Sequence, residues 1–250
     1  MPRIALITGA SSGIGRATAE AFAVAGYDLI LCGRREDRLK ELVDSVSTRV
    51  RAIALAFDVR SRKAMAHALD SLPNQWRAID ILVNNAGNAH GFDAINEGEP
   101  DDWDAMMDSN VKGLLYMTRA ITPGMIERGR GHIVNLSSIA GKETYANGAV
   151  YCASKAAVEA LSQGMRLDLT KHGIKVTNIA PGAVETEFSE VRFKGDKDRA
   201  SKVYEGFEPL RAEDIAKTIV FAVSAPDHVT IADITILASA QAAATTVHRK

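Results

Sequence analysis

A short apolar run, a glycine-rich turn and an alanine-rich segment follow one another at the start of the chain. Arg3 to Thr8 reads RIALIT, Gly9 to Gly15 reads GASSGIG, and Arg16 to Ala25 contains five alanines. This order predicts a strand, a tight turn and the beginning of a helix. Backbone N–H groups at such a helix N-terminus can bind the pyrophosphate of a dinucleotide. The glycine spacing is G-x-x-x-G-x-G, and by itself it is equally compatible with tight packing of the turn.

The same alternation of strand and helix continues along the chain. The predicted strands are residues 3–8, 28–32, 51–56, 79–84, 131–136, 174–180 and 231–237. The predicted helices between them are residues 14–25, 36–46, 62–71, 100–128, 150–170 and 212–224. Alternating strands and helices favour a doubly wound α/β domain with a seven-stranded parallel sheet flanked by helices. Ligands bind at the carboxyl ends of such strands, where Gly9, Asn84, Ser138 and Pro181 fall.

Length and charge restrict the classes of function. The 250 residues are 46% hydrophobic and 24% charged, which suits one α/β domain spanning residues 1–250. The net charge of −1 provides no long-range attraction for nucleic acid or for an anionic membrane. We therefore expect neither nucleic acid nor a membrane as a partner.

The cysteines, histidines and apolar runs indicate a cytoplasmic protein without a metal. No apolar stretch approaches the length of a bilayer span, and the N-terminus leads directly into a strand. Cys32 and Cys152 suit small buried thiols in a reducing compartment better than a disulfide framework. The six histidines lack metal-ligand spacing.

Tyr151 and Lys155 lie four residues apart in a predicted helix, and Ser138 lies upstream at the end of a strand. Residues i and i+4 share a helix face, so the Lys155 ammonium can approach the Tyr151 phenol. At about 4 Å and an effective dielectric of roughly 20, it would stabilise the phenolate by about 4 kcal/mol. That corresponds to roughly three pKa units, although burial opposes the shift. The pair alone is more often simple surface packing.

Several motifs together resemble the short-chain dehydrogenase/reductase family, and they cover nearly the whole chain in order. They are TGASSGIG at 8–15, NNAG at 84–87, Asn110, Ser138, Tyr151-x-x-x-Lys155 and PG at 181–182. The resemblance implies a single Rossmann domain that transfers hydride. VRFKGD at 191–196 and the ending VHRK are similar to the subgroup of NADP-dependent serine and 3-hydroxy acid (L-allo-threonine) dehydrogenases.

The residues after the second predicted strand bear on cofactor choice. A NAD site carries an acid about 20 residues beyond the glycines, whereas this chain has Arg34 and Arg35. Two guanidinium groups can bind a 2′-phosphate through charge-assisted hydrogen bonds, so we predict NADP. The alternative is that both arginines are solvated residues ahead of the next helix.

The resemblance also implies a full set of cofactor contacts. Asp58 and Val59 would hold the adenine, Asn84 and Gly87 the ribose, and Gly182 with Val184 and Thr186 the nicotinamide end. The alternative interpretation treats Asp58 as a helix cap and Asn84 and Asn85 as turn residues. The complete expected set is Gly9, Ser11, Ser12, Gly13, Ile14, Gly15, Arg34, Arg35, Asp58, Val59, Asn84, Ala86, Gly87, Tyr151, Lys155, Pro181, Gly182, Val184 and Thr186.

The expected catalytic residues are Asn110, Ser138, Tyr151 and Lys155. Ser138 would hydrogen-bond the substrate oxygen, and Tyr151 would exchange its proton. Lys155 would lower the Tyr151 pKa and bind the nicotinamide ribose. The family assigns Asn110 a water that links Lys155 to solvent, although it could also simply interrupt the helix that begins near Pro100.

Substrate recognition is expected from a lid at residues 182–207, whose composition is irregular. A small hydroxy acid needs a partner for its carboxylate, and we assign Arg192 to it beside Ser138 and Tyr151. Two other functions stay open: a family reductase acting on 3-oxoacyl thioesters, sugars or other carbonyls, and a non-catalytic dinucleotide sensor.

A homotetramer is expected because small residues are spread over the catalytic helix and family members usually pair through such helices. These residues are Ala153, Ala156, Ala157, Ala160 and Gly164. Ordinary packing of the helix on its own sheet is the alternative. The tail, residues 239–250, is expected to become ordered against a neighbouring subunit.

Overall fold

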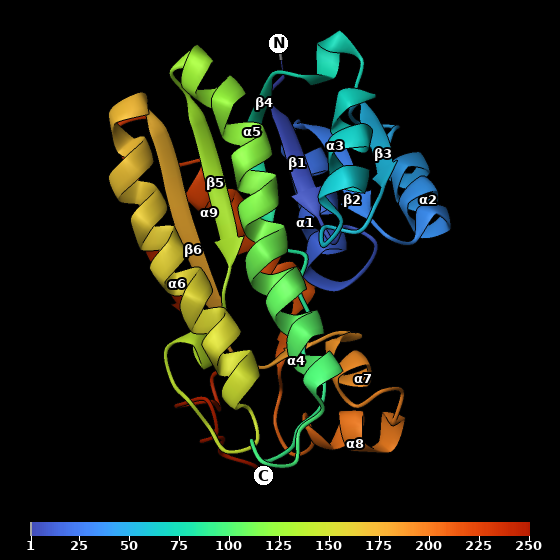
Figure 1. Ribbon diagram of the computed structural model, residues 1–250, viewed down its shortest axis with the longest axis vertical. Helices are drawn as coiled ribbons and strands as arrows, with labels where there is room; N and C mark the ends of the chain where they lie inside the picture. Colours follow the sequence, from blue (N-terminus) through green and yellow to red (C-terminus); the bar gives the residue numbers. More distant parts are fainter. Residues whose placement is uncertain (1) are drawn as a thin grey trace.

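The computed structural model describes residues 2–250 and contains a seven-stranded parallel sheet (Figure 1). The strand order is β3-β2-β1-β4-β5-β6-β9. The strands are β1 (Ile4–Thr8), β2 (Asp28–Gly33), β3 (Ala52–Ala56), β4 (Ile79–Asn84), β5 (Gly131–Leu136), β6 (Ile174–Pro181) and β9 (Asp233–Ile236). The order reverses direction between β1 and β4, which opens a crevice at the carboxyl ends of these strands. The predicted doubly wound sheet is confirmed.

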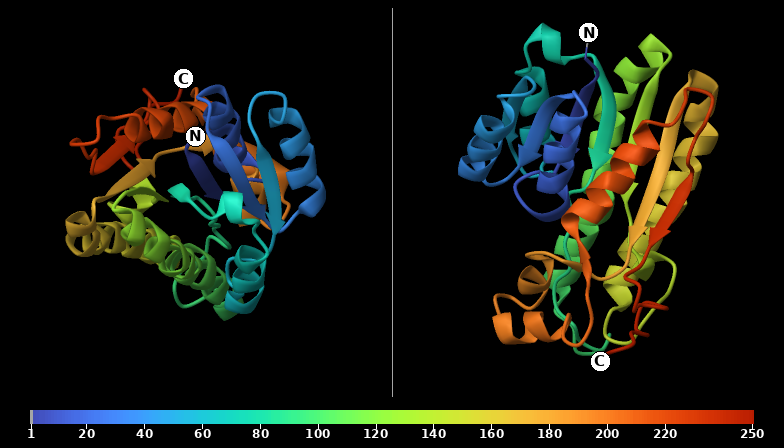
Figure 2. Two further views of the ribbon diagram at one scale, coloured as in Figure 1. Left: turned by 90° about the horizontal axis from the view of Figure 1, so that it is seen from above. Right: turned by 180° about the vertical axis from the view of Figure 1, so that it is seen from behind.

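Helices cover both faces of this sheet, as the view from above shows (Figure 2). One layer consists of α1 (Gly13–Val24), α2 (Glu36–Val46) and α9 (Ala212–Val223). The other consists of α3 (Arg62–Asp70), α4 (Pro100–Met107), α5 (Leu114–Arg128) and α6 (Ala149–Leu169). Short 3₁₀ turns lie at η1 (Asn74–Trp76), η3 (Ile139–Gly141) and η4 (Thr170–His172).

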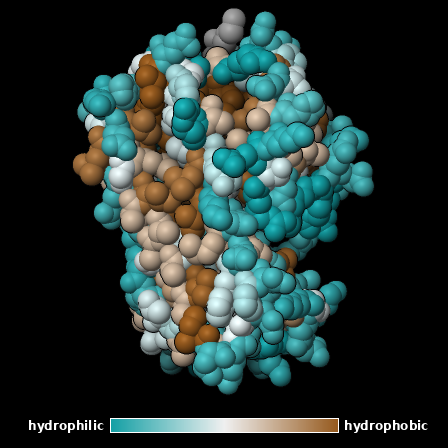
Figure 3. Space-filling model, in the orientation of Figure 1, coloured by the Kyte–Doolittle hydropathy of each residue, from teal (hydrophilic) through white to brown (hydrophobic). Residues whose placement is uncertain are grey.

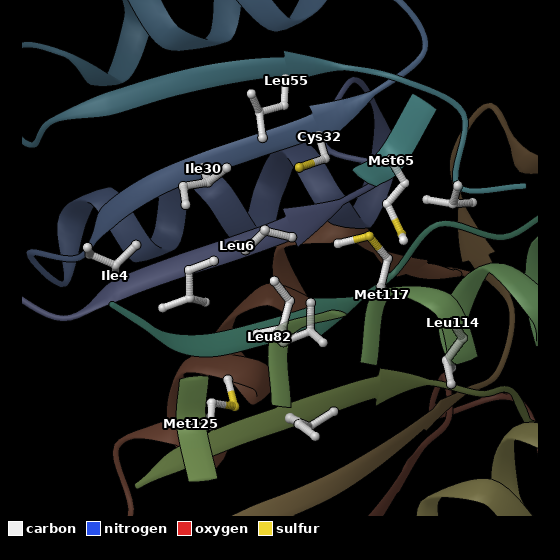
Figure 4. Close-up of a cluster of buried hydrophobic side chains, with 14 of the residues drawn as sticks. Ile4, Leu6, Ile30, Cys32, Leu55, Met65, Leu82, Leu114, Met117 and Met125 are labelled. Carbon is white, nitrogen blue, oxygen red and sulfur yellow. The ribbon is translucent and has the colours of Figure 1, made fainter. Parts of the chain in front are cut away.

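The five central strands, β2, β1, β4, β5 and β6, are buried on both faces, and their side chains alternate between two cores. Leu6 of β1 packs with Met117 of α5 in one cluster, which Figure 4 shows between the sheet and the helices. Its neighbour Ile7 packs with Phe22 of α1 in the other cluster. Burying one such side chain fully contributes about 1.5–3 kcal/mol. The period of two along β1 therefore holds both helical layers to the sheet.

The predicted helix at residues 100–128 is wrong in one respect, because the structure divides it. A π-helical turn, η2 (Asp108–Gly113), separates α4 from α5. Asn110 lies in this turn, and its side-chain amide accepts from the Asn88 N–H at 2.8 Å and donates to the Asn88 carbonyl at 2.8 Å. The wider turn directs a polar side chain inward where a regular helix would continue its ladder. Asn110 therefore does interrupt the helix, and it also holds a neighbouring loop.

The predicted lid forms a small layer beyond the carboxyl ends of the strands. It contains α7 (Phe188–Arg192) and α8 (Lys197–Lys202), and β7 (Val184–Glu185) pairs with β8 (Leu210–Arg211). In Figure 1 these helices lie at the end opposite the N-terminus, near the C-terminus.

The C-terminal tail packs on this lid within the same chain, and its expected contact with a neighbouring subunit stays a prediction. Arg249 donates to the carbonyls of Val203 and Glu205, and the Lys250 N–H donates to the Gly206 carbonyl at 2.8 Å. Backbone groups of the chain's own lid supply these partners, and a sequence pattern cannot reveal them. Across residues 2–250, no helix has both the length and the apolar character that crossing a membrane requires.

His132 of β5 is only 4% exposed, and burial with nearby Lys175 and Arg3 lowers its pKa to about 4. Its ring contacts the Thr177 hydroxyl at 2.8 Å. Since the unfolded histidine titrates near 6.5, the unfolded state binds the proton more readily between pH 6.5 and 4. As the pH is lowered from 6.5 to 4, the free energy of unfolding should therefore fall by about 3 kcal/mol because of His132 alone.

His132→Gln should flatten that pH dependence, measured by urea unfolding at a series of pH values from 4 to 7. His228→Gln is the matched control because His228 is exposed, and it should leave the dependence unchanged. A His132→Gln profile as steep as that of the unsubstituted protein would contradict the assignment.

Candidate active site

A cavity of about 750 Å³ lies at the carboxyl ends of the strands, between the glycine turn and the lid. The glycine turn after β1 forms one wall, and the segments after β4, β5 and β6 form the opposite walls. The lid and residues 241–249 of the tail close the outer side. This is the place where an open parallel sheet binds a ligand.

The glycine turn brings backbone unusually close to backbone. A Cβ on Gly15 would lie 2.3 Å from the Gly9 carbonyl oxygen, so a side chain cannot be accommodated there. Gly9 and Gly13 have φ of +67° and +52°, which favour glycine. Asn85 holds the turn by donating its side-chain amide to the carbonyls of Thr8 and Gly9. No side chain caps the N-terminus of α1, so its N–H groups are free to bind a phosphate.

Arg35 connects the glycine turn to the end of β2. Its guanidinium donates to the Ser11 hydroxyl at 3.1 Å and to the Ser12 hydroxyl at 2.6 Å. Arg34 is exposed beside it. Asp58, expected at the adenine, pairs with Arg60 at 2.7 Å, and Ser61 is the residue that caps α3. The helix-cap interpretation of Asp58 is therefore wrong.

Helix α6 presents Tyr151 and Lys155 to the cavity from one face, as their spacing predicted. Tyr151 is 8% and Lys155 is 6% exposed. The Lys155 ammonium donates to the Leu136 carbonyl at 2.9 Å and lies 6.0 Å from the centre of the Tyr151 ring. Ser138 follows β5, and its hydroxyl donates to the Pro181 carbonyl at 3.3 Å.

Burial dominates the electrostatics of this pair. It raises the pKa of Tyr151, nearby Tyr145 adds to the rise, and a hydrogen bond with Ser138 opposes it. Burial also lowers the pKa of Lys155 to about 8. The expected depression of the Tyr151 pKa by Lys155 is therefore absent from this arrangement. The physical reason is that the ammonium is itself desolvated and is directed to the Leu136 carbonyl.

Asn110 contacts helix α6, which contains Tyr151 and Lys155. Its amide donates to the Ser154 hydroxyl at 3.0 Å. A Cβ on Gly87 would lie 2.9 Å from the Asn110 Oδ1 and 3.4 Å from the Lys155 Nζ, so both side chains border the same glycine. Asn110 thus joins α6 to the segment after β4.

Arg192 of α7 enters the cavity beside Tyr151. Its guanidinium carbon lies 4.7 Å from the centre of the Phe92 ring and 5.6 Å from the ring centres of Tyr145 and Tyr151. Its Nη1 donates to the Tyr145 hydroxyl at 3.1 Å, and its Nε donates to the Gly91 carbonyl at 3.4 Å. Its Nη2 is buried and has no partner within the described residues. A buried charged donor without an acceptor is costly, and an anion in the cavity would satisfy it.

Most of the residues predicted from the sequence line this one cavity. They are Gly9, Ser11, Ser12, Gly13, Ile14, Arg34, Arg35, Asp58, Val59, Ala86, Gly87, Ser138, Tyr151, Lys155, Pro181, Gly182, Val184, Thr186 and Arg192. Gly15 and Asn110 do not line the cavity. Asn84 is the clear error, because it is 3% exposed and donates to Thr118 and Asn135 inside the core. Its neighbour Asn85 faces the cavity instead.

The cavity is also lined by residues that were not predicted from the sequence, among them Phe92, Tyr145, Glu187 and Gln241. Gln241 accepts from the Ala183 N–H at 2.9 Å and so connects the tail to the turn after β6. The only sequence feature that pointed to Tyr145 was its position, six residues before Tyr151. The others lie in loops, whose positions depend on tertiary packing.

Comparisons with known proteins agree with this geometry. The family model for short chain dehydrogenases matches residues 3–197. The chain belongs to the short-chain dehydrogenase family. This short-chain dehydrogenase is 46% identical over 248 residues to the NADP-dependent 3-hydroxy acid dehydrogenase YdfG of Salmonella typhi, covering 98% of this chain and 99% of the relative. It is 44% identical over 243 residues to sulfoacetaldehyde reductase 2 of Chromohalobacter salexigens, covering 97% and 96%.

A solved structure agrees equally well over the whole dehydrogenase. The closed form of a serine dehydrogenase complexed with NADP⁺ superposes with a TM-score of 0.93 at 44% identity, covering 99% of this chain and all of that one. Within residues 2–250, no group of three or more histidine, cysteine, aspartate or glutamate side chains could hold a metal ion.

Proposed function

We propose that this short-chain dehydrogenase transfers hydride, with NADP, between the nicotinamide and a small hydroxy acid such as serine, L-allo-threonine or 3-hydroxypropionate. The observation that carries the proposal is the unpartnered Nη2 of Arg192 in the cavity that also contains Tyr151 and Ser138. A substrate with a carboxylate for Arg192 and a hydroxyl for Tyr151 satisfies both ends. One relative that matches almost the whole chain is named for 3-hydroxy acids and another for sulfoacetaldehyde, and both names support an anionic substrate.

The residues present fit a dinucleotide. Gly9, Gly13 and Gly15 leave room for a pyrophosphate against the uncapped N-terminus of α1. Arg34 and Arg35 place two positive charges where a 2′-phosphate would lie, and no acid stands at the corresponding position of β2. When bound, the nicotinamide supplies the hydride acceptor or donor.

The chain's own groups hold the substrate and move its proton. Ser138 hydrogen-bonds the reacting oxygen. Because burial raises the pKa of Tyr151, its phenol keeps its proton at neutral pH and can donate it to a carbonyl oxygen during reduction. In the reverse direction the phenolate accepts the hydroxyl proton. Lys155, with a pKa of about 8, is mainly an ammonium at pH 7, and we assign it to the nicotinamide ribose.

The position of Arg192 sets the size of the substrate. Its guanidinium carbon lies 5.6 Å from the Tyr151 ring centre, so the carboxylate and the reacting carbon are only a few bonds apart. Phe92 and Tyr145 fix the guanidinium by stacking and by one hydrogen bond. A neutral carbonyl compound or a sugar would leave Nη2 unpaired, which disfavours the broader reductase function. A sulfonate would satisfy the guanidinium as well, so sulfoacetaldehyde belongs in the same assays.

Tyr151→Phe should lower NADP-dependent oxidation of serine by at least about 1000-fold, because it removes the proton-transfer group. Binding of NADPH, followed by its fluorescence, should change little. Tyr145→Phe is the matched control: it removes one hydrogen bond to the charged Arg192 and should cost no more than about 100-fold. Substantial turnover by Tyr151→Phe would exclude the proposed proton exchanger. Tight NADP binding with no turnover on serine, L-allo-threonine or 3-hydroxypropionate would favour the non-catalytic sensor.

Arg192→Ala should lower kcat/KM for 3-hydroxypropionate by about 100-fold, since a charged hydrogen bond contributes about 1.5–3 kcal/mol. Its neutral analogue, 1,3-propanediol, should lose less than about threefold. Lys197→Ala, an exposed lid cation, controls for the loss of positive charge. Equal losses for acid and diol would eliminate Arg192 as the carboxylate partner.

We also propose that the enzyme works as a homotetramer in the cytoplasm. Ala153, Ala156 and Ala160 are exposed along α6, and Figure 3 shows apolar surface on the face of the molecule that α5 and α6 occupy in Figure 1. The two buried free cysteines suit a reducing compartment. Light scattering should give a mass of about four chains of 26.8 kDa, and Ala156→Glu should reduce it by placing charges in a helix interface. A wild-type monomer would overturn this assembly.

A further inference from the structure

Glu187 spans the cavity from the lid to the arginines after β2. It immediately precedes α7, and one carboxylate oxygen lies 2.9 Å from the Arg35 Nη1. Its other oxygen lies 2.6 Å from the Arg38 Nη1. The three side chains are 42–43% exposed, so the group is reachable from solvent. No pattern in the sequence connects residue 187 with residues 35 and 38.

Arg35 is shared between two groups at this point. It donates to Ser11 and Ser12 of the glycine turn while it pairs with Glu187. The same guanidinium is the partner proposed above for the 2′-phosphate of NADP. A carboxylate that occupies its Nη1 competes directly with that phosphate and also repels it, because both are anions.

We infer that Glu187 is a specificity-determining residue that competes with the 2′-phosphate of NADP for Arg35 and so reduces the preference for NADP over NAD. The inference rests on the proposed function. When the phosphate takes Arg35, Arg38 remains as the partner of Glu187, because Arg38 does not line the cavity. The Glu187–Arg38 pair therefore keeps α7, and Arg192 at its end, over the site in both states.

NAD carries only a hydroxyl at the 2′ position, so it does not need to displace a carboxylate from Arg35. Removing the charge of Glu187 should thus help NADP selectively. The gain is limited because all three side chains are about two-fifths exposed and screened by water. An exposed ion pair of this kind corresponds to a change in affinity of up to about fivefold.

The test compares Glu187→Gln with the unsubstituted protein by titrating NADPH and NADH and following nucleotide fluorescence at low salt. Glu185→Gln is the matched control, because Glu185 is exposed and forms no ion pair within residues 2–250. We expect Glu187→Gln to tighten NADPH binding about fivefold and to change NADH binding less than twofold. Glu185→Gln should change neither.

Equal effects on the two nucleotides, or weaker NADPH binding in Glu187→Gln, would overturn the inference. Failure of the proposed cofactor is distinguishable, because the unsubstituted protein would then bind NADPH no better than NADH in the same titrations.

A second measurement needs no cofactor. If Glu187 holds the lid, trypsin should cleave cofactor-free Glu187→Gln faster after Lys194 and Lys197 than it cleaves Glu185→Gln. Equal rates would remove the lid part of the inference.

Discussion

The attachment of helix α6 to the end of strand β5 positions everything else in the site. Lys155 makes two contacts there: its ammonium donates to the Leu136 carbonyl at 2.9 Å, and its own carbonyl accepts from the Ser137 hydroxyl at 3.2 Å. A Cβ on Gly141 would lie 2.7 Å from that same Lys155 carbonyl, so the chain after β5 must approach the helix closely. Because this turn of α6 is held in place, Tyr151, one turn earlier in the helix, lines the same cavity as Ser138. Asn110 then extends the attachment to the segment after β4 through Ser154.

The burial of Tyr151 and Lys155 in this site shifts the pKa values of both side chains. Burial disfavours the charged forms of both Tyr151 and Lys155, raising the pKa of one and lowering that of the other to about 8. The two shifts move the proton affinities of the phenol and the amine apart, so Tyr151 keeps its proton more firmly and Lys155 releases its proton more readily. Burial also leaves the Arg192 Nη2 without an acceptor in the same cavity, and the carboxylate of the proposed substrate would satisfy it.

The lid connects the two ends of the site. Glu187 at the start of α7 reaches the arginines after β2, and Arg192 at its end reaches Tyr151. Only four residues separate them along the chain, so one short helix connects the proposed cofactor end of the cavity to its proposed substrate end. The tail supports this helix indirectly, since Arg249 holds the following segment at Val203 and Glu205.

Local rules were sufficient for the order of elements and for the central pair. Backbone geometry within a few residues explains the strand at RIALIT and the shared helix face of Tyr151 and Lys155. It also explains why glycine is favoured at positions 9 and 13, where φ is positive. Tertiary structure decided what depends on contacts between distant segments: that Asn85 and not Asn84 faces the cavity, that a π-turn divides the helix at Asn110, that burial and not Lys155 dominates the Tyr151 pKa, and that Glu187 meets Arg35. Desolvation and long-range pairing arise only when segments far apart in the chain meet, and no spacing along the sequence encodes them.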